Sequence, residues 1–233
     1  MSIEIEVLAD PARACAAMLL GAAAGGGHVV LAGGSTPRAA YVELVAAAEA
    51  VGASLSDATF WFGDERCVPP EDDQSNYLMA KRALLDRLGD GRQPRVHRMR
   101  GELGFSEAAD LYEQELRAAG PPQFEVLLLG MGPDGHTLSL FPDQPSLSER
   151  TRLVVGVPEA GLEPFVPRVT FTVPAVSLAR QVVFLVAGSS KADAVAAAFG
   201  PGASADPHLP ASVVAAAASE VKVLLDHDAA AKL

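Results

Sequence analysis

Short apolar runs alternate along the chain with stretches of helical periodicity, and this order limits the possible folds more than any other feature. The run Phe124–Leu129 is nearly all apolar, as expected for a strand covered on both faces of a parallel sheet. We expect strands at residues 3–8, 28–32, 59–62, 96–99, 124–129, 153–157, 169–173, 182–186 and 221–225, and helices at 11–24, 37–50, 76–88, 106–119, 191–199 and 211–218. This order predicts an α/β fold, a single doubly wound and mostly parallel sheet with helices on both faces, similar to a modified Rossmann fold. Without an internal repeat or a long polar linker, residues 1–233 are expected to form one domain.

Composition and charge limit the kinds of molecule that the protein is expected to bind. A net charge of −11 argues against a nucleic-acid partner, whereas local Arg and Lys residues still allow an anionic small molecule. The Ala-rich segment 14–24 is short for a membrane span and follows acidic residues, so we expect no signal peptide and no membrane association. Two cysteines cannot form a disulfide framework, which fits a cytoplasmic protein. We expect a monomer or a small homo-oligomer.

Three polar loops follow predicted strands, at residues 33–37 (GGSTP), 64–66 (DER) and 130–136 (GMGPDGH). Parallel strands would bring all three to one edge of the sheet, where ligands of such folds bind. Together they offer an anion-binding turn, an arginine and a histidine. This combination predicts an enzyme that acts on a small phosphorylated substrate.

The first loop has two interpretations of equal weight. Gly33 and Gly34 allow the backbone to approach a ligand, and Ser35 and Thr36 begin a helix whose N–H groups attract anions. An ordinary glycine turn with Ser35 or Thr36 as the helix cap explains the same residues. No Gly-Lys-Ser/Thr of a Walker loop follows. We similarly expect Ser106 to cap the helix at 106–119.

The third loop matches the dinucleotide fingerprint G-x-G-x-x-G, and Glu159 lies near the spacing of a ribose-binding acid. A tight turn is the better interpretation, because Pro133, Asp134 and Gly135 favour a turn over the first turn of a helix. His136 follows at once. Histidine titrates near neutrality and suits both general-base and general-acid catalysis, so His136 is the candidate base.

Charged residues elsewhere complete the list of candidates. Arg66 could stabilise an oxyanion, with Asp64 as an orienting group or a plain ion-pair partner. Arg168 begins a predicted strand, and Lys191 follows Gly-Ser-Ser at a helix start, so either could bind an anion or lie on the surface. Cys67 is interpreted as structural. The acidic residues 71–73 lack the spacing of a metal site, so we expect no metal.

Taken together, these motifs resemble the 6-phosphogluconolactonases, within the superfamily that also contains glucosamine-6-phosphate deaminases. The resemblance covers nearly the whole chain, through residues 33–37, 64–69, 75–77, 130–142, 168–170 and 188–192. Deaminases of this superfamily usually continue after Asp-Gly-His with Asn-Glu-Pro, which supplies a catalytic acid. Residues 137–142 read TLSLFP instead, the lactonase form with Leu138 in place of the usual alanine.

The resemblance implies hydrolysis of 6-phospho-D-glucono-1,5-lactone to 6-phosphogluconate in the oxidative pentose phosphate pathway, with no cofactor. We expect His136 to activate water, Arg66 to stabilise negative charge, and Asp64 or Asp134 to orient its neighbours. The remaining candidates would hold the phosphate: Gly33, Gly34, Ser35, Thr36, Arg168 and Lys191. A sugar-phosphate deaminase or isomerase, a non-catalytic sugar-phosphate sensor and a nicotinamide-dependent oxidoreductase are the alternatives.

Overall fold

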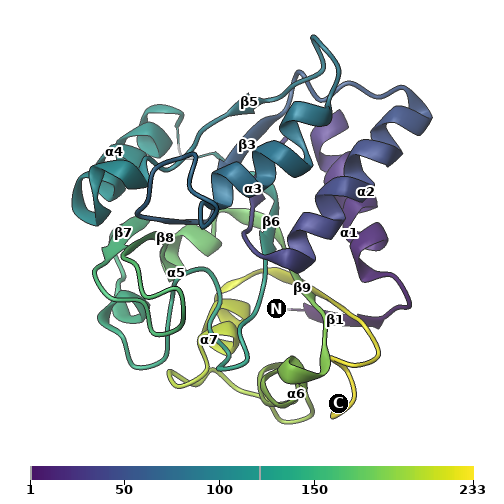
Figure 1. Cartoon of the computed structure of the whole chain (residues 1–233). Coiled ribbons are helices and arrows are strands. Elements are labelled where there is room, and N and C mark those ends of the chain that lie inside the picture. The colour runs from purple at the N-terminus through teal and green to yellow at the C-terminus, as the bar shows by residue number, and fades with distance from the viewer. Residues whose placement is uncertain (1, 121) are drawn as a thin grey trace.

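The computed structural model describes residues 2–120 and 122–233. Its centre is a seven-stranded, entirely parallel sheet with the strand order β1-β10-β9-β6-β2-β3-β5 (Figure 1). The strands are β1 (Ser2–Val7), β2 (His28–Leu31), β3 (Thr59–Phe62), β5 (Arg95–Val96), β6 (Phe124–Leu129), β9 (Ala179–Val186) and β10 (Glu220–Leu225). The predicted doubly wound parallel sheet is therefore confirmed.

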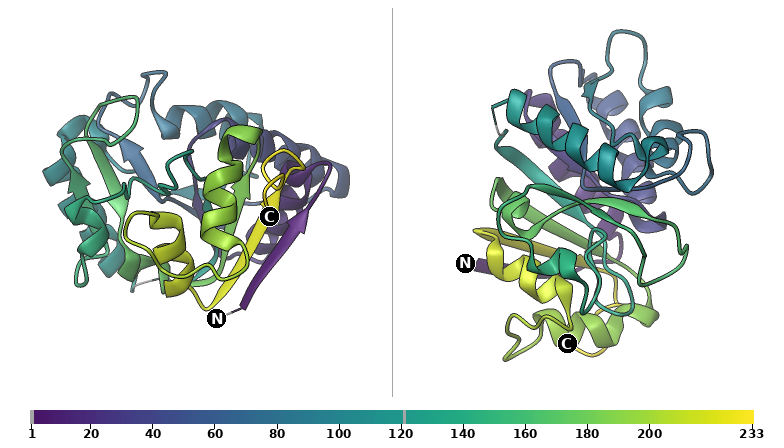
Figure 2. Two further views of the ribbon diagram at one scale, coloured as in Figure 1. Left: turned by 90° about the horizontal axis from the view of Figure 1, so that it is seen from below. Right: turned by 90° about the vertical axis from the view of Figure 1, so that its left-hand side faces the viewer.

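Helices cover both faces of this sheet (Figure 2). They are α1 (Pro11–Ala24), α2 (Ser35–Val51), α3 (Asn76–Ala83), α4 (Phe105–Ala118), α5 (Val173–Val176), α6 (Ala192–Phe199) and α7 (Pro210–Ala217), with short 3-10 helices η1 (Leu85–Arg87), η2 (Gly101–Leu103), η3 (Pro145–Ser148) and η4 (Ser189–Lys191). Successive side chains of a strand point to opposite faces. In β2, Val29 and Leu31 pack with α1, α2 and α3, whereas Val30 belongs to the core that includes α4, α6 and α7. The alternation divides the apolar side chains into two cores.

A second, three-stranded sheet lies on the α4 side and was not expected. It contains β4 (Asp64–Arg66), β8 (Arg168–Phe171) and β7 (Val154–Val157), paired antiparallel in the order β4-β8-β7. The segments 153–157 and 169–173 were expected as strands, but of the main sheet. The segment 64–66 was expected as a loop, and it is a strand because Gly63 separates β3 from a new ladder against β8. The backbone N–H of Phe171 donates to the Gly63 carbonyl at 2.7 Å.

Two predicted helix caps are wrong. The helix α2 begins at Ser35, and its N-cap is Gly34, with a φ of 101°. The helix α4 begins at Phe105 and its N-cap is Gly104, with a φ of 86°, so that Ser106 lies inside the first turn. Glycine adopts such angles without the steric cost that a side chain brings. The predicted helix 76–88 ends at Ala83 and continues as η1.

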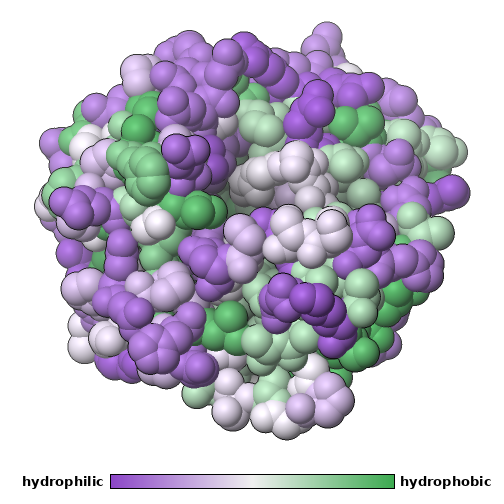
Figure 3. Space-filling model, turned by 60° about the horizontal axis from the view of Figure 1, so that its bottom comes forward, coloured by the Kyte–Doolittle hydropathy of each residue, from purple (hydrophilic) through white to green (hydrophobic). Residues whose placement is uncertain are grey.

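On the face drawn in Figure 3, hydrophobic side chains lie singly or in small groups among hydrophilic ones. The large exposed apolar residues come from separate parts of the chain, among them Ile3, Val51, Leu103 and Phe165. Within the described residues, no helix has the length and apolar character needed to cross a bilayer.

Candidate active site

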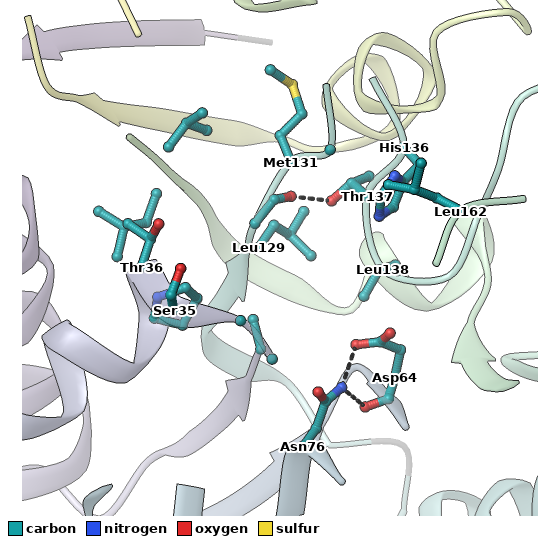
Figure 4. A pocket seen from close by; sticks show the side chains of 18 of the residues that line it. Ser35, Thr36, Asp64, Asn76, Leu129, Met131, His136, Thr137, Leu138 and Leu162 are labelled. Carbon is teal, nitrogen blue, oxygen red and sulfur yellow. Dashed lines mark hydrogen bonds between the residues drawn. The ribbon is translucent and has the colours of Figure 1, made fainter. Parts of the chain in front are cut away.

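The predicted loops meet in one pocket at the carboxyl ends of β2, β6 and β9 (Figure 4). The cavity has a volume of about 250 Å³. Its lining includes nine of the ten candidates, Gly33, Gly34, Ser35, Thr36, Asp64, Arg66, His136, Arg168 and Lys191. The tenth, Asp134, lies against His136. The expectation that these loops converge on one edge is confirmed.

The turn before α2 presents a helix start without a side-chain cap. Gly34 takes a positive φ, no side chain bonds the first-turn N–H groups in the described part of the chain, and Ser35 and Thr36 line the pocket. Such a terminus attracts anions through its unpaired N–H groups and its dipole. Gly33 has a different function. A Cβ there would lie 2.0 Å from Oδ1 of Asn76, so Gly33 is needed for a close packing contact.

His136 and Asp134 form a fixed pair. Nδ1 of His136 lies 2.6 Å from Oδ1 of Asp134, and the same oxygen accepts the backbone N–H of His136 at 3.2 Å. Burial raises the pKa of Asp134, but the hydrogen bonds and the charge of His136 outweigh it, so the pKa of this carboxyl is lowered. An ionised carboxylate at Nδ1 keeps the proton on that nitrogen and leaves Nε2 as the free base.

The loop that carries this pair is a tight turn and not the start of a dinucleotide-binding helix. The N–H of Gly135 donates to the Gly132 carbonyl at 3.0 Å, and the N–H of Gly132 donates to the His136 carbonyl at 2.9 Å. A Cβ at Gly132 would lie 2.1 Å from Nδ1 of His136. The second glycine of the apparent fingerprint therefore makes room for the imidazole.

Asp64 is held by residues other than His136. The carboxylate is buried and accepts a hydrogen bond from the Ser139 hydroxyl at 2.7 Å and one from Nδ2 of Asn76 at 3.2 Å. Of the two acids expected to orient a neighbour, only Asp134 is hydrogen-bonded to the histidine. Sequence reasoning missed Asn76 and Ser139 as part of the site. The sequence signal for Asn76 was Ser75, which caps the helix that begins at Asn76.

Lys191 and Arg168 both line the pocket. Burial lowers the pKa of Lys191, an effect that the nearby charge of Asp134 partly offsets. Burial likewise lowers the pKa of Arg168, whose surroundings include Asp64 and Arg66. The guanidinium of Arg168 donates to the carbonyls of Pro164 and Val166, at 2.7 and 3.1 Å. Asp134 is thus an acid near Lys191, and Asp64 an acid near Arg168.

Arg66 has unused hydrogen-bonding capacity. Its Nη1 donates to the Gln74 carbonyl at 2.5 Å, while its buried Nε has no hydrogen-bond partner among residues 2–120 and 122–233. The Gly-Ser-Ser turn before Lys191 offers an anion fewer backbone N–H groups than expected, because the N–H of Gly188 donates to the carboxylate of Asp226 at 2.9 Å.

The neighbouring residues are structural. The carboxylate of Glu65 is almost completely buried and accepts hydrogen bonds at the start of α3. Burial raises the pKa of Cys67 to about 11, which disfavours the thiolate. Within residues 2–120 and 122–233, no three His, Cys, Asp or Glu side chains group closely enough to hold a metal ion.

The family model described as glucosamine-6-phosphate isomerases/6-phosphogluconolactonase matches residues 5–223. The chain belongs to this family. It is 42% identical over 215 residues to the 6-phosphogluconolactonase of Mycobacterium tuberculosis, an alignment that covers 88% of this chain and 84% of the relative. The human 6-phosphogluconolactonase is 41% identical over 167 residues, covering 70% of this chain and 64% of the human protein.

Solved structures agree with this assignment. The 6-phosphogluconolactonase of Trypanosoma brucei has a TM-score of 0.82 at 28% identity, covering 100% of this chain and 99% of that protein. A monomeric glucosamine-6-phosphate deaminase has a TM-score of 0.84 at 20% identity and covers 100% of both chains. At that identity the second likeness shows the fold alone.

Proposed function

We infer that this enzyme is a 6-phosphogluconolactonase, which hydrolyses 6-phospho-D-glucono-1,5-lactone to 6-phosphogluconate in the oxidative pentose phosphate pathway. Within the family, the lactonase relatives and the sequence after His136 support this activity over deamination. One observation carries the mechanism. His136 has Asp134 on Nδ1 and lines a pocket that also contains an uncapped helix start and Lys191.

The 6-phosphate binds at the start of α2 in this proposal. Gly34, Ser35 and Thr36 offer backbone N–H groups and hydroxyls, while Lys191 and Arg168 supply positive charge. Gly33 supports this turn through its packing against Asn76. The phosphate lies far from C1 in the substrate, so its binding energy positions the lactone for reaction.

Hydrolysis then needs one base and one positive group. Nε2 of His136 takes a proton from water as the water oxygen bonds to C1, and the carbonyl oxygen becomes negatively charged. Arg66, which lines the pocket, stabilises that charge. The carbonyl re-forms as the bond between C1 and the ring oxygen breaks, and the imidazolium returns the proton to that oxygen. Asp134 holds the imidazole in the required tautomer. Neither a metal nor an organic cofactor takes part in these steps.

A coupled assay tests the activity. Glucose-6-phosphate dehydrogenase generates the lactone, and the disappearance of the lactone is followed with the spontaneous rate subtracted. We expect the protein to accelerate this disappearance in proportion to its concentration. An unchanged rate would reject the proposed function. The cytoplasmic location and the monomeric or small oligomeric state remain predictions from the sequence.

A further inference from the structure

Asn76 lies between two parts of the site that are far apart in the sequence. It is the first residue of α3, and its side chain is only 2% exposed. Nδ2 donates to the main-chain oxygen of Asp64 at 3.0 Å and to its carboxylate Oδ1 at 3.2 Å (Figure 4). Because two acceptors face this atom, it must be the nitrogen of the amide, and the orientation of the side chain is chemically fixed.

The same amide packs on the turn at Gly33. Oδ1 of Asn76 lies 2.0 Å from where a Cβ of Gly33 would be, and Cγ lies 2.3 Å from it. Only glycine permits this approach. The amide of Asn76 therefore separates Asp64 from the turn that begins α2, and it sets the distance between them.

Asn76 is itself held by a buried carboxylate. Oε1 of Glu65 accepts the backbone N–H of Asn76 at 2.7 Å, and Oε2 accepts the backbone N–H of Tyr77 and the hydroxyl of Ser75, at 2.8 and 2.9 Å. These bonds tie the first turn of α3 to β4. A side chain on such a support has little freedom to adjust, which is the requirement for a group that positions another.

Asp64 receives its second donor from the other wall of the pocket. The hydroxyl of Ser139 donates to Oδ2, and the backbone N–H of Ser139 donates to the Thr170 hydroxyl at 3.0 Å. Asn76 and Ser139 thus hold one carboxylate oxygen each. The charges of Arg66 and Arg168 lie in the same part of the pocket.

We propose that Asn76 is a positioning residue of the lactonase, acting through Asp64. Its amide fixes the Asp64 carboxylate against the turn at Gly33. This carboxylate therefore keeps a constant position relative to the bound phosphate. The inference rests on the proposed function. It assigns a role to a buried residue that lines the pocket beside Asp64.

A double-mutant cycle with Asn76→Ala and Asp64→Asn tests this role, with kcat and KM measured for all four proteins. In the native background, Asn76→Ala should lower kcat/KM by about 10- to 100-fold, the range for losing a hydrogen bond to a charged group. In the Asp64→Asn background the same change should cost less than about threefold, because the carboxylate that it positions is gone. An equal loss in both backgrounds would overturn the proposal.

Thr172→Val serves as the matched control. It deletes a buried hydroxyl that donates to the Arg152 carbonyl at 2.6 Å, outside the pocket lining. We expect it to lower the unfolding midpoint and leave kcat/KM near the native value. A comparable loss of kcat/KM in this control would show that lost stability alone explains the effect of Asn76→Ala.

A second variant covers the case in which Asn76→Ala does not fold. The isosteric Asn76→Asp fills the same space against Gly33 and sets two carboxylates against each other. It should lower kcat/KM more in the native background than with Asp64→Asn, where an amide again faces a carboxylate and only the bond to the main-chain oxygen of residue 64 is lost. If the native protein does not hydrolyse the lactone, the proposed function fails and this inference with it. If the native protein is active but the substitutions at Asn76 and Asp64 show no coupling, only the role of Asn76 is rejected.

Discussion

The imidazole of His136 is confined from three sides. Asp134 bonds Nδ1, the ring of Phe141 lies with its centroid 4.8 Å away, and Gly132 leaves no room for a side chain beneath it. The side chain of His136 remains 20% exposed, on the pocket side. This arrangement holds one nitrogen and frees the other, which is what acid–base catalysis by histidine requires.

Replacing His136 should therefore remove turnover while binding persists. We expect His136→Asn to lower kcat by about 10²–10⁴-fold, the usual contribution of a positioned acid–base group. The affinity for 6-phosphogluconate, measured by calorimetry, should change little because the phosphate-binding groups remain. His136→Ala should behave similarly. If both variants keep native turnover after subtraction of spontaneous hydrolysis, the base must be sought elsewhere.

Lys191 should make phosphate binding sensitive to alkaline pH. Because burial lowers its pKa, Lys191 loses its proton at a lower pH than an ordinary lysine does. Affinity for 6-phosphogluconate should be full below that pKa and fall as pH rises through it. Calorimetry from about pH 7 to about pH 10 measures this, and Lys191→Arg should reduce the fall because arginine stays charged. Parallel pH curves for the two proteins would contradict the assignment.

At the scale of elements, the sequence predicted the main sheet because its strands are locally encoded as apolar runs between turns. The small sheet was missed because its order depends on pairing between distant segments, such as Glu65 with Val169. The caps at Gly34 and Gly104 were missed because serine and threonine nearby looked like better caps. The candidate residues were found because their chemistry is visible in single motifs, whereas Asn76 acquires its role only through contacts with Gly33 and Asp64.

Two histidines and a tryptophan connect the strands β2 and β3 and the segment after β5. Nε1 of Trp61 donates to Nδ1 of His28 at 2.9 Å, and the ring of His97 stacks on Trp61 with a centroid distance of 4.0 Å. Burial lowers the pKa of His28, the charges of His97 and Arg95 lower it further, and Glu125 opposes them. The neutral imidazole is the form that accepts the hydrogen bond from Trp61.

Protonation of His28 should make the fold less stable in mild acid. Since the pKa of His28 is lower in the folded chain, the unfolded chain binds the proton first, and stability falls as pH drops below the unfolded value of about 6.5. Denaturant titrations followed by the fluorescence of Trp61, the only tryptophan, measure this between about pH 8 and about pH 5. The variant His28→Gln should lose less stability over that interval than the native protein. An equal loss of stability would show that His28 does not cause the acid sensitivity.

At the scale of the whole molecule, both faces of the sheet contribute to one pocket. The helix α2 covers one face, while His136 and Arg168 belong to segments packed on the other. The two cores share the strands of a single sheet, so we expect them to unfold together. Far-UV circular dichroism and Trp61 fluorescence should then report one transition with the same midpoint. Two separate midpoints would contradict the prediction of one domain over residues 1–233.

The place of β1 in the sheet has a consequence for the chain as it leaves the ribosome. Among the strands of residues 2–120 and 122–233, β1 pairs with β10 alone, in a register that sets Ser2 beside Glu220. β1 precedes β10 in the chain and can pair only after β10 has been synthesised, and β9 also lacks its outer neighbour until then. Contacts between such distant segments form late in folding. A nascent chain that has not yet reached β10 should therefore expose unpaired edges of β1 and β9, to which chaperones would bind.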